Sequence, residues 1–272
     1  MGLWVAAGQL CSTENVADNL NRSRAVVKAA AAAGAKLVGL PENFAYLGSD
    51  RDHKVALSEP VDDAADGPIL SAMRQTAQEA SVWLLLGGFP ERVKEPDRIG
   101  NTSLLLDPAG KIQARYRKMH LFDVDVPGGQ RFRESDSIVP GGEVVVADTP
   151  WGGLGLSICY DLRFPELYRQ LGARGARVIA VPAAFTRETG KDHWHVLLRA
   201  RAIENQAFVF APAQYGFHGG KRASYGHALV VDPWGVVLAE CGDREGFALA
   251  ELDFDQQDTI RRNLPCLSHR RL

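Results

Sequence analysis

Short apolar runs alternate with helical patterns along the whole chain. Apolar runs of strand length predict buried strands at Leu3–Leu10, Leu37–Leu40, Val82–Gly87, Val144–Ala147, Leu154–Ile158, Val178–Val181, Phe208–Ala213 and Phe247–Leu252. Capping residues, terminal glycines and leading prolines predict helices at Asn15–Ala33, Pro68–Ala80, Pro165–Leu171 and His193–Asn205. This alternation predicts an α/β protein.

Two further segments predict β-hairpins. Ser103–Ile112 and Leu229–Leu238 are each a pair of apolar runs joined by Asp-Pro-x-Gly. Proline at the second position and glycine at the fourth favour a type I turn, so we expect each pair of runs to be antiparallel. The resulting ten or more strands are too many for one comfortable open sheet. We therefore expect two sheets packed face to face with helices outside, in a single domain over residues 1–272.

Composition narrows the choice of partners and compartment. The chain of 272 residues carries 31 Lys and Arg against 33 Asp and Glu, and no block of like charge stands out. We therefore expect no nucleic-acid partner and no membrane partner. The start of the chain lacks the basic region of a signal peptide, and no window approaches ~20 apolar residues. A cytoplasmic, reducing location is expected, which would keep a thiol available.

Cofactor and nucleophile motifs are mostly missing from the sequence. No GxGxxG follows a strand, and neither a GxxxxGK[ST] loop nor a GxSxG elbow occurs. The four cysteines, at positions 11, 159, 241 and 266, have neither CxxC nor zinc-ligand spacing. We therefore expect no metal site, no organic cofactor and no disulfide framework.

Cys159 occupies a position suited to a nucleophile. An apolar strand ends abruptly there, polar residues follow, and Pro165 begins the next helix. A side chain on such a turn lies near N-terminal amides of a helix, which stabilise a thiolate and can donate to an oxyanion. The alternative interpretation is that Cys159 merely closes a buried strand, as many cysteines do.

Three charged residues lie where ligand sites form in α/β proteins. Glu42 follows the strand at Leu37–Leu40, Lys118 follows a strand through Tyr116, and Glu134 is expected in a loop rich in Gly and Pro. Taken singly, each is as well explained as an ordinary solvated charge. One of the seven histidines offers another partner for the thiol, although no papain-like or caspase-like signature surrounds it.

Taken together, these segments resemble the nitrilase superfamily of carbon-nitrogen hydrolases. Its three catalytic segments are matched in order by Pro41–Phe44, by Tyr116–Gly128 with Glu134, and by Gly155–Glu166. The stretches His193-Trp194 and Arg199–Asn205 also fit, so the resemblance spans nearly the whole chain. It implies a four-layer αββα sandwich of two mixed β-sheets flanked by helices. It also implies a homodimer or higher homo-oligomer, formed through the helices after Cys159 and around His193–Asn205.

The resemblance implies a thiol-dependent amidase that needs no cofactor. In this family pattern Glu42 is the general base, and Cys159 is the nucleophile that forms a thioester with a linear amide. Lys118 stabilises the oxyanion together with the backbone N–H of Tyr160. Glu134 positions the substrate amide or Lys118 and assists proton transfer.

The sequence indicates less clearly which branch of the superfamily it resembles, and therefore which substrate is expected. Lys221–His227, followed by Val230–Gly235, is similar to the branch that hydrolyses deaminated glutathione. The neighbouring ω-amidase branch, which acts on α-ketoglutaramate, shares the core motifs. A nitrile hydrolase or a non-catalytic binding protein of the same fold are further alternatives, although the four intact catalytic residue types disfavour the last.

The expected substrate is a small amide that carries carboxylates, so the site should offer a cation. Arg163, four residues after the nucleophile, is the candidate, with a structural ion pair at the start of the helix as the alternative. By their position in the family pattern, Tyr46, Phe185 and Thr189 are expected to line the pocket. Phe185–Gly190 and Asp125–Gly129 are expected to be mobile loops near its mouth.

Overall fold

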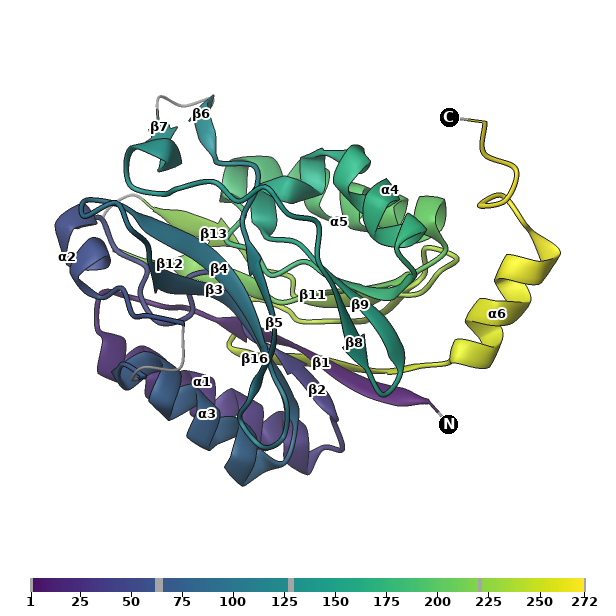
Figure 1. Cartoon of the computed structure of the whole chain (residues 1–272), viewed down its shortest axis with the longest axis horizontal. Coiled ribbons are helices and arrows are strands. Elements are labelled where there is room, and N and C mark those ends of the chain that lie inside the picture. The colour runs from purple at the N-terminus through teal and green to yellow at the C-terminus, as the bar shows by residue number, and fades with distance from the viewer. Residues whose placement is uncertain (1, 62–65, 127–129, 220–221, 272) are drawn as a thin grey trace.

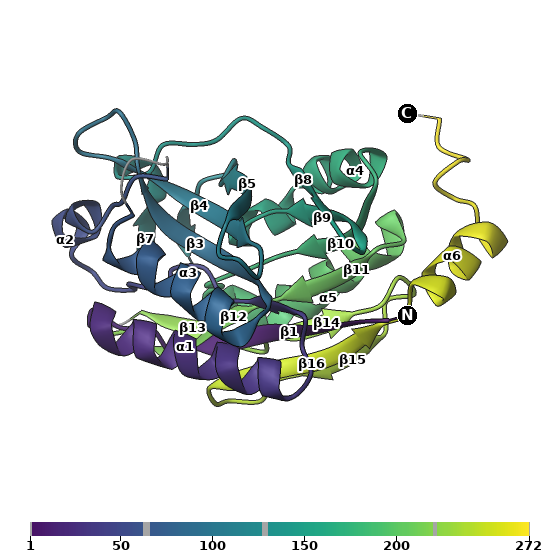
Figure 2. The same ribbon diagram turned by 60° about the horizontal axis from the view of Figure 1, so that its bottom comes forward.

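Two β-sheets pack face to face with helices on both outer faces (Figure 1). The computed structural model describes residues 2–61, 66–126, 130–219 and 222–271. Helices α1 (Val16–Ala32) and α3 (Pro68–Ala80) lie side by side against one sheet, as Figure 2 also shows. Helices α4 (Pro165–Ala173) and α5 (Arg187–Asn205) cover the other. The predicted α/β sandwich with two mixed sheets is confirmed.

The first sheet has the strand order β13-β12-β1-β2-β3-β4-β5, with β16 also paired to β1. Its strands are β1 Leu3–Leu10, β2 Leu37–Gly39, β3 Trp83–Arg92, β4 Ile99–Leu106, β5 Ile112–Arg117, β12 Ala213–Phe217, β13 Ala223–Tyr225 and β16 Gly246–Leu252. Strand β1 pairs parallel with β2 and antiparallel with β16, so the sheet is mixed.

The second sheet has the order β15-β14-β11-β10-β9-β8. Its strands are β8 Val146–Thr149, β9 Gly152–Leu156, β10 Ala176–Ala180, β11 Phe208–Ala211, β14 Leu229–Val231 and β15 Val237–Glu240. A separate hairpin is formed by β6 and β7, and two further helices lie outside the sandwich layers; their bounds are β6 Asp123–Val126, β7 Gln130–Arg133, α2 Arg51–Ala56 and α6 Phe254–Asn263. Among the described residues, no helix combines the length and apolar content needed to cross a membrane.

Strand β1 shows why the central strands are apolar on both faces. Leu3, Val5 and Ala7 belong to the core between the two sheets. Ala6 and Leu10 belong to the core between the first sheet and α1 with α3. Because successive strand side chains point to opposite faces, a strand buried on both faces has no polar alternation. The continuous apolar run Leu3–Leu10 therefore correctly predicted a buried strand. The predicted buried strand Val144–Ala147 is shifted to Val146–Thr149, and only Ala147 of that strand is buried.

Both Asp-Pro-x-Gly turns form as predicted. The N–H of Gly110 donates to the carbonyl of Asp107 at 2.8 Å, and the N–H of Gly235 donates to that of Asp232 at 2.9 Å. The two glycines have φ values of 76° and 88°, a left-handed conformation that glycine adopts at little cost. Strands β4 and β5, like β14 and β15, pair antiparallel across these turns.

The predicted strand Phe208–Ala213 is in fact two strands in different sheets. Strand β11 ends at Ala211 in the second sheet, and β12 begins at Ala213 in the first. Pro212 between them has no N–H to give to a ladder, so it suits the point where the chain crosses from sheet to sheet. This crossing ties the two sheets together.

Three local expectations about loops need correction. Helix α5 begins at Arg187, six residues before the prediction, because the side chain of Thr186 caps it. Most of the expected mobile loop Phe185–Gly190 is therefore the first turn of a helix. Glu134 lies in a short 3₁₀ helix, Glu134–Asp136, that directly follows β7. The expected loop at 125–129 starts inside β6, and its residues 127–129 lie outside the described part of the chain.

Candidate active site

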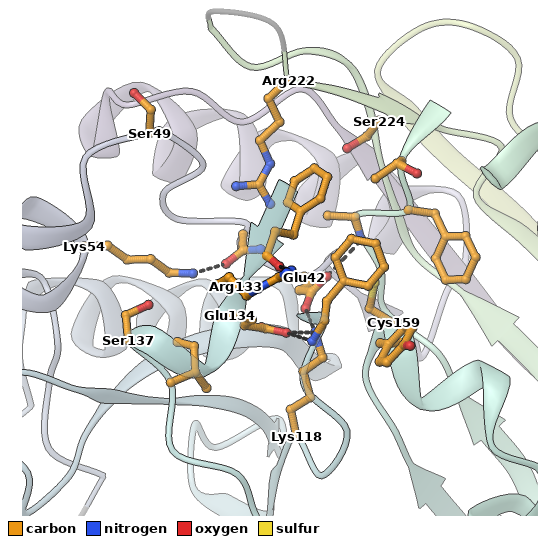
Figure 3. Close-up of a pocket in the computed structure, with 18 of the residues that line it drawn as sticks. Glu42, Ser49, Lys54, Lys118, Arg133, Glu134, Ser137, Cys159, Arg222 and Ser224 are labelled. Atoms are coloured by element: carbon orange, nitrogen blue, oxygen red, sulfur yellow. Dashed lines mark hydrogen bonds and ion pairs between the residues drawn. The ribbon is translucent and has the colours of Figure 1, made fainter. Parts of the chain in front are cut away.

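A cavity of about 270 Å³ collects the candidate catalytic side chains from distant parts of the chain. Glu42 follows β2, Lys118 follows β5, Glu134 follows β7 and Cys159 follows β9. All four line this cavity, and Figure 3 shows their functional groups turned toward one another. The structure thus brings together the residues that the sequence singled out.

Lys118 lies between the two glutamates. Its Nζ is 2.9 Å from Oε1 of Glu42 and 2.7 Å from Oε2 of Glu134. The side chain of Lys118 is only 2% exposed, so these ion pairs are largely shielded from water. A buried ammonium is tolerated only when opposite charges and hydrogen bonds compensate its lost hydration. The two carboxylates provide that compensation.

Asn101, on β4, holds the same two carboxylates from another side. Its Nδ2 donates to Glu42 at 2.8 Å and to Glu134 at 3.1 Å. The second oxygen of Glu42 accepts the backbone N–H of Ala184 at 3.0 Å. Glu134 also accepts the N–H of Phe122 at 2.8 Å. These bonds fix both carboxylates before any substrate arrives, which is the preorganisation a catalytic site requires.

The protonation states follow from burial and from these contacts. Burial alone would raise the pKa of Glu42, but the charge and hydrogen bond of Lys118 outweigh it, and the pKa is lowered. Burial would lower the pKa of Lys118, but the charges of Glu134 and Glu42 raise it well above its usual value. Burial and the charge of Glu42 raise the pKa of the Cys159 thiol well above its usual value. At neutral pH the site therefore holds a protonated thiol on Cys159, an ammonium on Lys118 and an ionised carboxylate on Glu42.

The thiol of Cys159 lies within hydrogen-bonding reach of the Glu42 carboxylate. A protonated nucleophile beside an ionised base is the arrangement needed for general-base activation. The backbone of Cys159 has a φ of +50°, in the left-handed region that non-glycine residues seldom adopt. Its N–H donates to the carbonyl of Pro182 at 2.9 Å, which helps to hold this unusual conformation.

The 3₁₀ helix Cys159–Arg163 carries the candidate oxyanion donor. Its first internal hydrogen bond runs from the N–H of Asp161 to the carbonyl of Ile158 at 3.1 Å. The N–H of Tyr160 precedes this bond, so it has no acceptor within the helix. The Asp161 carboxylate accepts the N–H of Ile158 at 2.8 Å and the hydroxyl of Tyr116 at 2.7 Å, which anchors the turn.

The expected substrate-binding residues divide into two groups. Arg163, Phe185 and Thr189 line the cavity beside Cys159. The Arg163 guanidinium lies 5.1 Å from the ring centre of Phe185 and 3.2 Å from Nδ1 of His193. It forms no ion pair with a carboxylate of the described residues.

Tyr46 does not line the cavity, and that expectation is corrected. Its side chain is 4% exposed, its ring stacks on His53, and its hydroxyl donates to the carbonyl of Asp50 at 3.2 Å. The chain turns inward after Asn43, whose φ of 59° redirects the backbone. Tyr46 therefore packs against α2 rather than facing a ligand.

Four cations that the sequence interpretation did not single out also line the cavity: Arg51, Lys54, Arg133 and Arg222. Lys54 on α2 donates to Oδ1 of Asn43 at 2.9 Å, and Arg222 precedes β13 (Figure 3). Burial lowers the pKa of Lys54 to about 8, although the charge of Glu134 opposes that effect. Nothing in the local sequence distinguishes Lys54 from a surface charge. Arg222 belongs to the segment Lys221–His227 that resembled a substrate branch, but only the fold shows that it lies in the cavity with Glu42.

His218 supports the hairpin of β12 and β13. Its Nδ1 lies 2.8 Å from the carbonyl of Ser12, and its Nε2 lies 2.8 Å from the hydroxyl of Ser224. The ring is therefore a neutral tautomer that donates to Ser12 and accepts from Ser224. Burial lowers the pKa of His218 to about 4.

We expect this histidine to make the protein less stable in mild acid. Because its pKa is ~6.5 in an unfolded chain, the unfolded state binds more protons between pH 6.5 and 4, and stability falls as pH falls through that window. The contribution lost between pH 7 and 4.5 is about 2 kcal/mol. Urea unfolding of the wild type and H218Q at both values measures it. Equal losses in the two proteins would contradict the assignment.

A possible metal-ligand group lies apart from the cavity. His195, His227 and Glu240 place their ligand atoms within 4.8 Å of one another. Oε1 of Glu240 is 2.9 Å from Nε2 of His195 and 2.5 Å from Nδ1 of His227. Oε1 of Glu240 thus links the two imidazole rings in a hydrogen-bonded cluster, and none of the three residues lines the cavity.

A buried thiol, a carboxylate base and an ammonium around one cavity define a hydrolase that works through a cysteine. Residues 4–262 match the model of the carbon-nitrogen hydrolase family. The chain belongs to this family, whose members cleave carbon–nitrogen bonds.

Individual relatives agree with this assignment. The chain is 46% identical over 268 residues to the deaminated glutathione amidase of Synechocystis sp., covering 97% of each protein. It resembles the structure of the C. elegans NitFhit protein with a TM-score of 0.92 and 41% identity, covering 99% of this chain and 65% of that one. It thus spans just under two thirds of the NitFhit chain.

A bacterial amidase structure adds a chemical parallel. The chain resembles a glutamate-to-glutamine mutant of the amidase from Nesterenkonia sp. AN1, with a TM-score of 0.78 and 28% identity. The match covers 96% of this chain and 98% of that one. That structure shows the product of Michael addition of acrylamide at the active-site cysteine.

Proposed function

We propose that this protein hydrolyses the amide bond of deaminated glutathione through a thioester on Cys159. The observation that carries the proposal is the contact of the Cys159 thiol, the Glu42 carboxylate and the Lys118 ammonium beside one cavity. Similarity to deaminated glutathione amidases over nearly the full length of the chain supports the choice of substrate.

In the acylation half, Glu42 takes the thiol proton as Sγ of Cys159 attacks the amide carbonyl carbon. The negative charge that forms on the carbonyl oxygen is stabilised by the Lys118 ammonium and by the N–H of Tyr160. One such donor contributes on the order of 3 kcal/mol to the transition state. Glu42 then gives its proton to the leaving nitrogen, the carbon–nitrogen bond breaks, and a thioester remains on Cys159.

In the deacylation half, Glu42 takes a proton from water as the water oxygen attacks the thioester carbonyl. The same two donors stabilise the second oxyanion, and the departing sulfur regains a proton from Glu42. The site then returns to its starting state, with no metal or organic cofactor taking part. Glu134 stays paired with Lys118 throughout and, with Asn101, holds that ammonium and Glu42 in place.

Steady-state hydrolysis of two substrates tests the proposed specificity. Deaminated glutathione is expected to give a kcat/KM at least about 10-fold above that of α-ketoglutaramate, because a second carboxylate adds charge-assisted contacts in a cationic cavity. The reverse preference would assign the protein to ω-amidases. Turnover of neither compound would remove the proposed substrate class.

We also infer that residues 1–272 form a single domain and that the protein is cytoplasmic.

We further infer that the protein assembles at least as a homodimer. The support for this assembly is a group of exposed apolar side chains on α5 and on the neighbouring hairpin of β14 and β15: Val196, Ile203, Trp234, Val236 and Leu238. Apolar groups of this kind on a folded surface mark contact sites between proteins. Light scattering would show a mass of at least twice 29.6 kDa, and a monomer at micromolar concentration would refute the assembly.

A further inference from the structure

The cavity carries more positive charge than the proposed chemistry uses. Among the described residues, six cations and four carboxylates line it. Two of these carboxylates, Glu42 and Glu134, form ion pairs with Lys118. The remaining cations are Arg51, Lys54, Arg133, Arg163 and Arg222. A cavity with this imbalance favours an anionic ligand.

Among these cations, Arg222 has the fewest interactions of its side chain with other described residues. No ion pair or side-chain hydrogen bond to another described residue holds its guanidinium, which reaches into the cavity from the side opposite Lys118 (Figure 3). Arg133, by contrast, pairs with Asp125 at 3.1 Å and donates to a backbone carbonyl. An enclosed guanidinium without a partner costs free energy that a bound carboxylate would recover.

The position of Arg222 is nevertheless defined. Its carbonyl accepts the N–H of His218 at 3.0 Å, and its N–H donates to the carbonyl of Gly219 at 3.3 Å. His218 is itself anchored to Ser12 and Ser224. The backbone of Arg222 is therefore held by two hydrogen bonds to His218 and Gly219, as a preformed binding group requires.

Lys54 lies within electrostatic range of Arg222, and each of the two is in range of Glu42 and Glu134. Its Nζ makes one hydrogen bond, to Asn43, and keeps two further donors. When an anion lies between two cations inside an enclosed site, its attraction to both offsets their mutual repulsion. The pair is thus arranged for a ligand rather than for stability alone.

We propose that Lys54 and Arg222 form a carboxylate-binding subsite that selects anionic over neutral amide substrates. The proposal rests on the proposed amidase function and names two specificity residues for it. Arg222 supplies a planar pair of N–H donors suited to a carboxylate, and Lys54 adds a second cation. Deaminated glutathione carries one carboxylate in its acyl half and one in its leaving half, and the subsite binds one of them.

Three substrates and matched variants test this subsite. Deaminated glutathione has a carboxylate in each half, α-ketoglutaramate has one in the acyl half alone, and butyramide has none. R222M is expected to lower kcat/KM for deaminated glutathione by about 10- to 100-fold, mainly through KM, and to leave butyramide within about 2-fold. R222K is expected to recover part of the lost kcat/KM for deaminated glutathione, and K54M is expected to lower that kcat/KM by about 10-fold.

The α-ketoglutaramate arm identifies the carboxylate that is bound. If the subsite binds the carboxylate of the acyl half, R222M lowers kcat/KM equally for deaminated glutathione and α-ketoglutaramate. If it binds the carboxylate of the leaving half, R222M leaves kcat/KM for α-ketoglutaramate unchanged. R187M is the matched control, because Arg187 is exposed and does not line the cavity. If R187M lowered kcat/KM for deaminated glutathione as much as R222M, the effect would come from the overall electrostatic field of the protein rather than from a subsite. That result would overturn the proposal.

Failure of the subsite can be told apart from failure of the proposed function. An R222M enzyme that keeps wild-type kcat/KM for deaminated glutathione, or that loses butyramide hydrolysis equally, overturns the subsite alone. A wild type that cleaves no amide overturns the proposed function. In that case calorimetry with glutarate still decides, because R222M should weaken binding of this dicarboxylate at least about 10-fold, and equal affinity would contradict the subsite.

Discussion

C159A is expected to lose amide hydrolysis by at least about 10⁴-fold in kcat, because Cys159 carries the only thiol among the described residues that line the cavity. The thiol is the nucleophile in the proposed sequence, and a methyl group in its place has neither the proton that Glu42 removes nor a lone pair for attack. The substitution removes one buried atom, so the free energy of unfolding should fall by no more than about 1–2 kcal/mol. Steady-state kinetics together with a urea melt measure both quantities.

C241A is the matched control for this variant. Cys241 is half-buried, and burial raises the pKa of its thiol to about 11, yet it does not line the cavity. Its replacement should leave kcat within about 2-fold of the wild type. Turnover by C159A near the wild-type rate would show that the amide is cleaved without a cysteinyl thioester.

E42Q is expected to lower kcat by about 10²- to 10⁴-fold while retaining the shape of the site. The amide keeps the size of the carboxylate and still offers an oxygen to Lys118, but it cannot accept a proton from the thiol or from water. Because the pKa of the Cys159 thiol is raised by burial and by Glu42, the thiol stays protonated at neutral pH and does not attack unaided. Stopped-flow acylation and steady-state rates should fall together.

Glu91 offers the comparison that separates catalysis from ion-pair stability. It is also a buried glutamate, 3% exposed, and it pairs with Arg117 at 2.8 Å and accepts from Thr102 at 2.6 Å. E91Q should reduce stability and leave kcat within about 3-fold. If E42Q and E91Q changed kcat equally, Glu42 would be a structural residue, and the general-base assignment would be wrong.

The sequence predicted the parts of the fold that depend on local rules. Helix Pro68–Ala80 has the bounds that its leading proline and periodicity indicated. The Asp-Pro-x-Gly turns also formed, because proline and glycine restrict their own backbone whatever surrounds them. The start of α5 was missed because a capping threonine at position 186 outweighed the polar character of the residues after it.

The candidate site was predictable only where a family pattern marks it. Glu42, Lys118 and Cys159 lie at strand ends within recognisable segments. Asn101 gave no signal, since an asparagine inside an apolar strand is not distinctive, and its two carboxylate partners lie 59 and 33 residues away. Lys54 was missed for the same reason, and Arg222, although it belongs to the marked segment Lys221–His227, could not be placed in the cavity without the fold.

The left-handed backbone of Cys159 was likewise hidden from the sequence. Glycine is the usual signal for a positive φ, but here a cysteine adopts a φ of +50°. Tertiary contacts impose it: the N–H of Cys159 is bound by Pro182, and Asp161 holds the following turn. Strain of this kind at a reactive side chain accords with a functional role and could not be read from propensities.

The most direct test of the account is the covalent intermediate itself. Rapid mixing with p-nitrophenyl butyrate, whose good leaving group makes deacylation the slow step, should release a burst of nitrophenol equal to the enzyme concentration. Peptide mapping after acid quenching should then find one butyryl group, on Cys159. A butyryl group on a different residue, or continuous turnover with neither burst nor adduct, would contradict the account.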